Sequence, residues 1–428
     1  MTAEEFRLLA DPAVRRLVET HLHADPVRLA FTLKCDRPTA LAVCGQVKYL
    51  QRARTKLPSY HAARCIVPPL SYEQCSSEAA AAVKDYAGEL CIDLTCGLGV
   101  DACHFSRRFR KVVAVERDPV LADIARYNFR LLGASNIEVV NDSAENFLQG
   151  CDRETADLIY LDPARRNGAD RRVFLLRDCS PDVTALLPSL LAHGTKTVIK
   201  LSPLFDAEEA LRIFHPHVSR LGIVSIGNEC KELLVELTPA ARPGRPEEPE
   251  YAVFPSGRRP YVFPLSEKDL LLSPSGNAPE PDALPEKISE RFPWLLIPDV
   301  AFYKGRLLRS LFARYYPETE VCIPTETGFC FAAKAPADFP GKAFRIAEIH
   351  EYRLKTLRKW LRERKIQRLN LLKRNFPYPA EAIAKALGIG EGGNDCAAFT
   401  EVNDRPVMLL LEPFESYGQP APSKHESP

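Results

Sequence analysis

The sequence predicts an α/β fold with a mostly parallel sheet, followed by a smaller α+β region. Three observations lead to this prediction. Short apolar segments alternate with helical patterns between residues 90 and 238, as in a parallel sheet covered by helices on both faces. A Gly-x-Gly turn directly follows the first of these segments. The last two segments are joined by residues 227–232, a connection too short for a helical crossover, so they are expected to form an antiparallel hairpin.

Composition sets the limits for this fold. The chain has 428 residues, of which 46% are hydrophobic and 26% charged, so sizeable cores can form. The net charge of +1 predicts no polyanionic partner, and any nucleic-acid surface must be a local patch.

The 13 cysteines include no Cys-x-x-Cys pair, and no metal site is expected. The first residues lack the pattern of a signal peptide, and no apolar run has membrane-spanning length. We expect a soluble cytoplasmic protein with reduced thiols and no membrane contact.

Residues 1–85 are expected to form an N-terminal helical region, with apolar residues at helical spacing in Phe6–Leu22 and Leu41–Arg52. Ser76 or Ser77 is a suitable N-cap for an alanine-rich helix over Ala79–Tyr86. The sheet domain is expected to span residues 86–240 and to contain seven strands. These are Cys91–Leu94, Val112–Val115, Ile137–Val140, Leu158–Leu161, Thr197–Leu201, Ile223–Ile226 and Leu233–Leu237.

The C-terminal half is predicted in three parts. Residues 239–285 contain 11 prolines, so residues 241–342 are expected to combine a linker with a small ferredoxin-like α+β region. That region contains a hairpin formed by Glu320–Ile323 and Gly328–Phe331. Residues 343–415 are expected to form a second α+β region, and residues 416–428 a flexible tail. The elements expected in 343–415 are a helix over 343–364, a strand Gln367–Leu372, a helix Ala380–Leu387 and strands Cys396–Val402 and Val407–Leu411.

Four carboxylates lie at the carboxyl ends of the first four predicted strands, one at each strand. They are Asp93, Glu116, Asp142 and Asp162. Because the carboxyl ends of parallel strands meet at one edge of a sheet, where open α/β sheets bind their ligands, these side chains are expected to line one site. A carboxylate at Glu116 can accept both hydroxyls of a ribose. One at Asp142 can accept a hydrogen bond from an exocyclic amine such as that of adenine.

Two cofactors are compatible with the turn alone. The segment Gly97–Ala102 formally matches the Gly-x-Gly-x-x-Gly/Ala fingerprint of dinucleotide sites, so a dehydrogenase is one alternative. That fingerprint holds a pyrophosphate at a helix N-terminus. Asp93 and Asp101 flank this turn and would repel a pyrophosphate, whereas they suit a ligand with a cationic methionyl end. The flanking charges therefore favour S-adenosylmethionine.

Residues 71–238 resemble class I S-adenosylmethionine-dependent methyltransferases, which have a Rossmann-like sheet. Asp93–Gly99 matches their motif I, with Thr95 in place of the usual first glycine, and Asp162–Arg165 matches motif IV. The whole chain resembles a bacterial methyltransferase family with a C-terminal THUMP-like domain. The segments that carry this wider resemblance are Glu73–Glu78, Asp162–Arg166, Ile199–Pro203 and Leu369–Pro377. It implies S-adenosylmethionine as cofactor, S-adenosylhomocysteine as product and RNA as substrate. The residues implied to hold the cofactor are Asp93, Thr95, Gly97, Gly99, Glu116, Asp142 and Ser143.

The motif IV segment suggests how a methyl acceptor is held. In amino-methyltransferases the acidic residue and a proline carbonyl accept hydrogen bonds from the target amine, so Asp162 and Pro163 are the expected catalytic residues. Arg165 stands where an aromatic ring is usual; its guanidinium plane can stack on a base or bind a phosphate, as can Arg166. The segment Ser76–Glu78 is similar to the corresponding helix start of trimethylguanosine-synthase-like enzymes, which favours a guanine amino nitrogen as acceptor.

Carbon 5 of uridine is a second candidate acceptor, because Asp162–Arg165 also resembles motif IV of methyltransferases that act on that atom. Those enzymes need a cysteine nucleophile after the next strand. The corresponding segment here is Leu201–Pro203 and contains none, so a covalent cysteine mechanism is not expected.

A basic segment favours RNA as substrate. Residues 345–374 hold 11 lysines and arginines but 3 acidic residues, and Tyr352, Trp360 and Phe376 interleave with them. Such a stripe fits phosphate contact with base stacking, although a solvated helix whose aromatics are core gives the same pattern. The residues expected to contact RNA are Arg358, Arg362, Lys373 and Arg374. The alternatives are a methyltransferase acting on a small molecule or protein, and a non-catalytic RNA-binding protein with a vestigial cofactor site.

Overall fold

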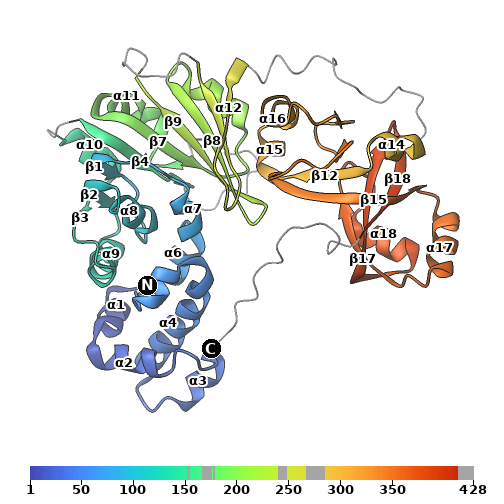
Figure 1. Ribbon diagram of the computed structural model, residues 1–428. Coiled ribbons are helices and arrows are strands. Elements are labelled where there is room, and N and C mark those ends of the chain that lie inside the picture. The colour runs from blue at the N-terminus through green and yellow to red at the C-terminus, as the bar shows by residue number, and fades with distance from the viewer. Residues whose placement is uncertain (152–154, 166–175, 177–178, 240–247, 267–284, 413–428) are drawn as a thin grey trace. The chain divides into compact units, whose positions relative to one another are not determined.

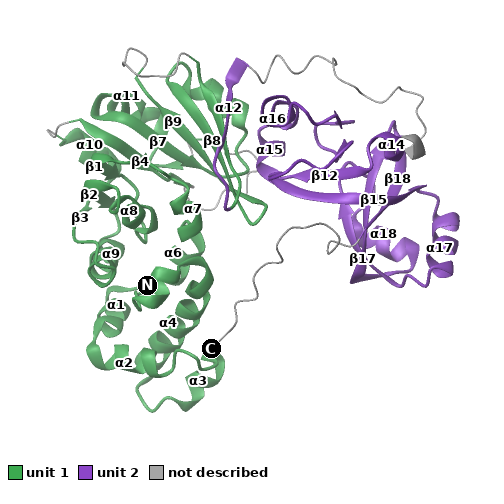
Figure 2. Cartoon of the chain, viewed as in Figure 1, with its two compact units in different colours: residues 1–256 green, residues 257–428 purple. Residues whose placement is uncertain are grey.

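The computed structural model describes residues 1–151, 155–165, 176, 179–239, 248–266 and 285–412 (Figure 1). The chain divides into two compact units, residues 1–256 and 257–428, which Figure 2 shows in different colours. The first unit contains the N-terminal helices and the parallel sheet, and the second contains an α+β fold of its own.

The first unit opens with seven helices, in the region where the sequence predicts helical structure without fixing their number. They are α1 (Ala3–Ala10), α2 (Pro12–Thr20), α3 (Pro26–Thr32), α4 (Arg37–Lys56), α5 (Pro58–Ala62), α6 (Pro69–Gln74) and α7 (Glu78–Ala82). Several begin at side-chain caps. Asp11, Asp25 and Asp36 accept backbone hydrogen bonds ahead of α2, α3 and α4, each of which has a proline in its first turn. Ser77 caps α7 in the same way, which decides between the two predicted caps.

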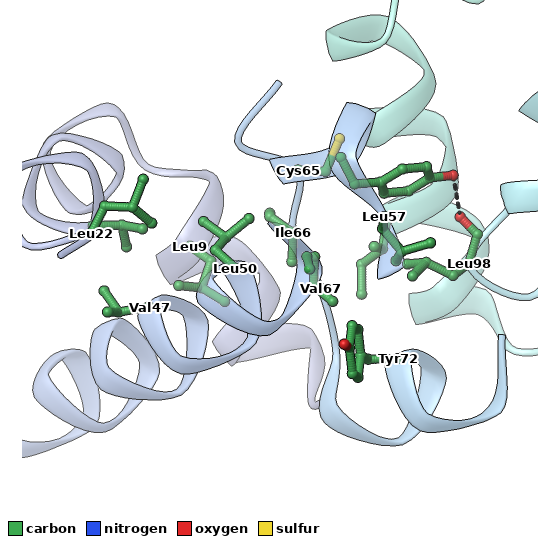
Figure 3. Packing of buried hydrophobic residues seen from close by; sticks show 14 of the residues in the cluster. Leu9, Leu22, Val47, Leu50, Leu57, Cys65, Ile66, Val67, Tyr72 and Leu98 are labelled. Atoms are coloured by element: carbon green, nitrogen blue, oxygen red, sulfur yellow. Dashed lines mark hydrogen bonds between the residues drawn. The ribbon is translucent and has the colours of Figure 1, made fainter. Parts of the chain in front are cut away.

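The N-terminal helices pack against the glycine turn of the sheet domain. Their hydrophobic cluster contains Leu9, Val47 and Leu50 together with Leu98, which lies between the two glycines of the turn (Figure 3). The buried Tyr60 hydroxyl donates a hydrogen bond of 3.1 Å to the Leu98 carbonyl, drawn as the dashed line in Figure 3. This packing fixes α4 and α6 next to the edge of the sheet where the site is expected.

The seven predicted strands are confirmed. They are β1 (Gly88–Asp93), β2 (Phe109–Glu116), β3 (Ile137–Asn141), β4 (Ala156–Leu161), β7 (Gly194–Leu201), β8 (Val218–Ile226) and β9 (Glu229–Leu237). They lie in the order β8-β9-β7-β4-β1-β2-β3, and β9 runs antiparallel to both of its neighbours. A further strand, β10 (Glu250–Phe254), pairs parallel with β8 inside the segment expected as linker or irregular cover.

Helices cover both faces of this sheet. In Figure 1, α7, α8 (Val100–Phe105) and α9 (Pro119–Leu131) lie on one face, whereas α10 (Ala144–Gln149), α11 (Val183–His193) and α12 (Ala207–Phe214) lie on the other. A short antiparallel pair, β5 (Ala164–Arg165) and β6 (Cys179–Ser180), follows β4 in the chain. Because β1, β2, β3 and β4 are parallel, their carboxyl ends meet at one edge.

The second unit is built on a sheet of order β13-β14-β12-β15-β18-β17-β16, in which β16 and β17 are parallel. The strands of this sheet are β12 (Trp294–Pro298), β13 (Val321–Cys322), β14 (Cys330–Ala332), β15 (Gly341–Glu351), β16 (Arg368–Lys373), β17 (Gly390–Val402) and β18 (Arg405–Leu411). The short strand β11 (Tyr261–Pro264) is not part of it. The helices of the second unit are α14 (Pro285–Arg291), α15 (Val300–Lys304), α16 (Leu308–Tyr315), α17 (Leu354–Glu363) and α18 (Ala380–Leu387). The antiparallel pair β13 and β14 confirms the predicted hairpin.

One predicted element of the second unit is wrong. A single helix was expected over residues 343–364, but the chain forms β15 and then the shorter helix α17. In β15, the buried Phe344 and Ile346 alternate with the exposed Arg345 and Ala347, which is the period of a half-buried strand. Pairing of β15 with β12 and β18 on its two sides stabilises this conformation.

Among the helices that the structure describes, none combines the length and the apolar character that a membrane crossing requires.

Candidate functional site

A cavity of about 1290 Å³ lies at the carboxyl ends of the parallel strands in the first unit. Its walls come from the glycine turn after β1, from the ends of β2, β4 and β7, and from helices α4 and α6. Most of the residues predicted for a cofactor meet here. The predicted residues that line the cavity are Thr95, Gly97, Gly99, Glu116, Asp142, Ser143, Asp162 and Pro163.

The turn that follows β1 requires its glycines. Gly97 and Gly99 have φ angles of +56° and +85°, in the left-handed region that residues with a Cβ rarely adopt. A Cβ on Gly99 would lie 2.3 Å from Cζ of Phe129, a residue of α9. The Gly97 amide donates a 2.8 Å hydrogen bond to Oε2 of Glu116, which ties the turn to the end of β2.

Thr95, the departure from the usual glycine of motif I, has a structural role. Its hydroxyl oxygen accepts a 2.6 Å hydrogen bond from the Asp162 amide and so joins the ends of β1 and β4. The Thr95 amide in turn donates to Asp93 at 3.0 Å. Asp93 is almost fully buried beneath the turn, and this burial raises the pKa of its carboxyl to about 8 although the Thr95 amide opposes the shift.

The next two carboxylates are held at the edge of the cavity by backbone amides. Glu116 accepts a second hydrogen bond, from the Asp118 amide at 2.9 Å, in addition to the bond from the turn. Asp142 Oδ1 accepts from the Ser143 amide at 2.8 Å. The Ser143 hydroxyl accepts from the Asn146 amide at 3.1 Å as the N-cap of α10, so this oxygen is engaged in the helix.

The fourth carboxylate, Asp162, is paired with a lysine that sequence reasoning did not assign to the site. Lys200 Nζ lies 2.6 Å from Asp162 Oδ2. Pro163 is buried and lines the cavity. The backbone of Arg165 belongs to β5, opposite Cys179, and its side chain is outside the part described. Arg166 lies outside the described residues.

Behind Asp162 lies a buried polar network. Ser76 Oγ is 2.9 Å from Lys200 Nζ, 2.9 Å from Asp101 Oδ2 and 3.0 Å from Glu232 Oε1. Lys84, whose side chain is 0% exposed, lies 2.8 Å from Asp101 and 2.7 Å from Glu232. The buried Tyr160 hydroxyl donates to Asp101 at 3.1 Å. Each charge in this network therefore has a partner of opposite sign, which a buried ion needs.

This network changes the interpretation of Asp101. The sequence suggested a carboxylate available to a cationic ligand, but Asp101 is bound to Lys84 within the protein. Burial opposes ionisation of Asp101, yet Lys84 and Lys200 outweigh it and lower its pKa to about 2. For Lys200, burial disfavours the charged form, but Asp162 and Glu232 outweigh this cost and raise its pKa. Both groups are consequently ionised at neutral pH.

The sequence carried one signal for this network. Lys200 is the last residue but one of β7. Its neighbours Val198, Ile199 and Leu201 are buried and apolar, so a charged side chain in that position is unusual in a central strand. Lys84 and Glu232 had no comparable signal, because only the tertiary fold brings Lys84, which follows α7, next to Glu232 of β9.

The predicted RNA-contacting residues lie in the second unit. Arg358 and Arg362 of α17 are exposed, and their Nε atoms donate to the Ala386 and Arg358 carbonyls at 2.6 and 3.1 Å. Lys373 is also exposed, and its Nζ donates to the Phe376 carbonyl at 3.3 Å. The Arg374 guanidinium lies 3.5 Å from the centre of the Tyr303 ring.

The aromatics of the basic segment pack against the core of the second unit, and one of them is fully part of it. Phe376 is 7% exposed, and Tyr352 and Trp360 are half-buried against the same hydrophobic cluster. The Phe376 ring packs edge-on against Tyr352 and Phe399. The expectation that Phe376 is available for stacking on a base is therefore wrong. The cations of α17, by contrast, are exposed.

Comparisons with known proteins agree with this geometry. Residues 341–413 match the family described as THUMP domain-like, and residues 79–176 match the family described as conserved hypothetical protein 95. A tRNA/tmRNA (uracil-C(5))-methyltransferase from Shewanella frigidimarina is 29% identical over an alignment of 149 positions, which covers 29% of this chain and 40% of that protein. An uncharacterized S-adenosylmethionine-dependent methyltransferase from Mycobacterium tuberculosis is 30% identical over 127 residues, 30% of this chain and 33% of that protein.

A crystal structure provisionally assigned as a methyltransferase, from Porphyromonas gingivalis W83, has a TM-score of 0.77 and 24% identity. The match covers 94% of this chain and 98% of that one, and it shows the fold. The chain spans between a third and two fifths of the length of the curated relatives named above. Together, these comparisons confirm the resemblance to class I S-adenosylmethionine-dependent methyltransferases and to a C-terminal THUMP-like domain.

Proposed function

We propose that this protein is an S-adenosylmethionine-dependent methyltransferase that methylates a base in structured RNA. The observation that carries the proposal is the position of Asp162. Asp162 and the glycine turn line the same cavity. The hydrogen bond from the Asp162 amide to the Thr95 hydroxyl holds Asp162 beside the turn. A cofactor on the turn and an acceptor at Asp162 would therefore meet in one cavity, which favours a direct transfer between them.

The proposed cofactor fits the residues around the turn. Carboxylates line this part of the cavity, and they suit a cationic ligand better than a pyrophosphate. We propose that Glu116 accepts the ribose hydroxyls, Asp142 and Ser143 contact the adenine side, and Asp93 and Thr95 support the methionyl end. Gly97 and Gly99 let the backbone approach the ligand. S-adenosylmethionine, when bound, supplies an electrophilic methyl group.

On the acceptor side, we propose that Asp162 and the Pro163 carbonyl accept hydrogen bonds from an amino group. Lys200 Nζ lies 2.6 Å from Asp162 Oδ2. The other oxygen, Oδ1, is therefore the one proposed to accept a hydrogen bond from the substrate. The ammonium of Lys200 also keeps Asp162 in a fixed orientation. Arg165 and Arg166 are proposed to orient the base or an adjacent phosphate. This arrangement supports an amino nitrogen, with that of guanine as the specific proposal.

Methylation at carbon 5 of uracil, which the name of the Shewanella relative indicates for that protein, has less support here. That carbon is activated by a thiolate nucleophile. Within the part of the chain that the structure describes, the cysteines lining the cavity are Cys75 and Cys96. Burial raises the pKa of Cys75 to about 11 and that of Cys96 well above its usual value, so both are thiols at neutral pH.

RNA as the acceptor is supported by the THUMP domain-like match and by the exposed cations of α17. The relative from Shewanella is named as a tRNA and tmRNA enzyme, which supports the same substrate class. We propose the cytoplasm as the location of the reaction. Small molecules and proteins remain the alternatives that the experiment below distinguishes.

The proposal is tested by transferring label from S-adenosylmethionine to RNA from a strain that lacks the protein, followed by nucleoside analysis. Asp162→Ala is expected to reduce transfer at least about 100-fold, because hydrogen bonds that position an acceptor contribute at this scale. Cofactor affinity, measured by calorimetry, is expected to stay within about threefold of the original protein. Asp123→Ala, on the exposed face of α9, is the matched control. Unchanged turnover in Asp162→Ala would overturn the role given to this residue.

A further inference from the structure

Two parts of the cavity lining differ in charge. The wall formed by residues 94–145 includes the carboxylates Glu116, Asp118, Asp142 and Glu145, as well as Asp101, which Lys84 neutralises, but a single cation, Arg117. The strand ends of β4, β7 and β9 add both signs, with Asp162 and Glu232 beside Lys200 and Lys231. A second wall, formed by residues 52–80, holds Arg52 and Lys56 of α4. Among the described residues of that second wall, none that lines the cavity is acidic. The neutral residues there include the hydrogen-bonding side chains of Thr55, Ser71 and Gln74.

Arg52 and Lys56 are held in place by aromatic rings. The Arg52 guanidinium lies 5.3 Å from the centre of the Tyr49 ring and 4.9 Å from that of Tyr72. Lys56 Nζ lies 4.9 Å from the Tyr72 ring and donates a 2.6 Å hydrogen bond to the Tyr72 carbonyl. One face of α4 therefore presents two cations, four residues apart and already ordered.

Both cations retain hydrogen-bond donors for a ligand. A guanidinium has five N–H groups and an ammonium three. The partner of Arg52 is Glu73, 2.5 Å away, in a pair whose side chains are 44% and 51% exposed. A pair with this exposure is weak and can be exchanged for another anion. The carbonyl contact of Lys56 neutralises none of its charge.

We propose that Arg52 and Lys56 bind a phosphate adjacent to the methylated nucleotide, so that the N-terminal helices form the nucleic-acid wall of the catalytic cavity. This inference rests on the proposed function and adds the surface that holds the acceptor. The charge division fits two ligands of opposite character: a cationic cofactor on the acidic wall and an anionic strand on the basic wall. A phosphate held on α4 and a base held at Asp162 would then share one cavity.

The segment Glu73–Glu78, which carried part of the family resemblance, acquires a role in this arrangement. Glu73 pairs with Arg52, and Ser76 binds Lys200 behind Asp162. Glu78 accepts hydrogen bonds from the amide and hydroxyl of Ser59, at 2.8 and 2.7 Å, and so holds α7 against α5. The segment thus connects the basic wall to the acceptor carboxylate. It also places Glu73 as an internal competitor of the phosphate.

The test measures binding of a short single-stranded RNA of mixed sequence to the full chain as a function of salt. Arg52→Gln and Lys56→Gln are each expected to weaken binding several-fold and to reduce the slope of log K against log salt by about 1. Glu73→Gln is expected to strengthen binding, because it removes the competing anion. Arg54→Gln is the matched control: this residue is exposed on α4 but does not line the cavity. Affinity for S-adenosylmethionine is expected to be the same in all four variants.

The outcomes separate this inference from the proposed function. RNA binding and salt slopes equal to those of the original protein in Arg52→Gln and Lys56→Gln, with methyl transfer to RNA intact, would overturn the inference alone. A loss of cofactor affinity in the same variants would overturn it too, because the wall would then support the cofactor. A parallel titration with guanosine monophosphate distinguishes the source of the phosphate. If the variants weaken binding of the mononucleotide while RNA neither binds nor is methylated, both the inference and the RNA substrate are overturned.

Discussion

Lys84 and Lys200 lie inside the first unit, whereas Arg358 and Arg362 lie on the surface of the second. The Lys84 side chain has no exposed area and is held between Asp101 and Glu232. Lys200 is 9% exposed and is bound to Asp162 and Ser76. The two arginines are exposed and their Nε atoms bond to carbonyl oxygens, which neutralise no charge. Positively charged side chains therefore occur in two different environments: buried and paired with carboxylates in the first unit, and exposed without a neutralising partner among these contacts in the second.

The difference shows what each setting can do. A buried ion loses its hydration, so it must be matched by partners in fixed positions, and removing one partner leaves an uncompensated charge. The network can thus orient Asp162 but cannot move far. Exposed cations retain water, interact weakly with their neighbours and remain available to a polyanion. The buried set is suited to positioning an acceptor, and the exposed set to attracting RNA.

The largest expected difference between buried and exposed cations is in their contribution to the free energy of unfolding. Lys84→Met removes the cation between Asp101 and Glu232 and is expected to destabilise the fold by roughly 3–5 kcal/mol, because two buried carboxylates lose their partner. Lys355→Met, on the exposed surface of α17, is expected to change stability by less than about 0.5 kcal/mol. Denaturant unfolding of both variants measures the difference. Equal losses in the two variants would refute the distinction between buried and exposed cations.

A smaller effect is expected from the buried carboxylate Asp93. Burial raises its pKa to about 8, so in the free protein it is protonated below that pH. A cationic cofactor favours the ionised form, so binding releases a proton below pH 8 and affinity increases as the pH rises toward 8. Between about pH 6.5 and pH 8 we expect affinity for S-adenosylmethionine to improve about tenfold, or about 1.4 kcal/mol.

Asp93→Asn provides the control for this titration, since an amide does not ionise. Its cofactor affinity is expected to be weaker and nearly independent of pH over the same range, as followed by calorimetry. A pH dependence that persists in Asp93→Asn would assign the titration to another group.

The smallest effect is expected on the surface of the second unit. Reversing both charges, Arg358→Glu with Arg362→Glu, is expected to weaken RNA binding about fivefold, or about 1 kcal/mol, and to flatten its salt dependence. Unfolding free energy is expected to change by less than about 0.5 kcal/mol. Lys342→Glu on β15 is the control outside α17. If RNA affinity and salt slope match those of the control, the basic face of α17 is only a solvated surface.

The secondary structure of the first unit was easier to predict from the sequence than that of the second, for a physical reason. In the first unit, helical crossovers between parallel strands repeat one local pattern, so the strands could be placed from hydrophobic runs and turns alone. In the second unit, residues 343–351 were predicted as helix because apolar residues such as Ile346 and Ile349 also fit helical spacing. Pairing of β15 with β12 and β18 settled the conformation, and that pairing joins residues far apart in the chain.

By itself, the sequence determined the order of strands and helices in the first unit, the glycine turn and the carboxylates at the strand ends. These features depend on local patterns, because each strand end places its own next residue at the edge of the sheet. The tertiary structure alone decided that Lys84, Lys200 and Glu232 form one network behind Asp162, and that Arg52 and Lys56 line the same cavity. Charges far apart in the chain become partners only when burial makes water unavailable to them, and burial is a property of the whole fold.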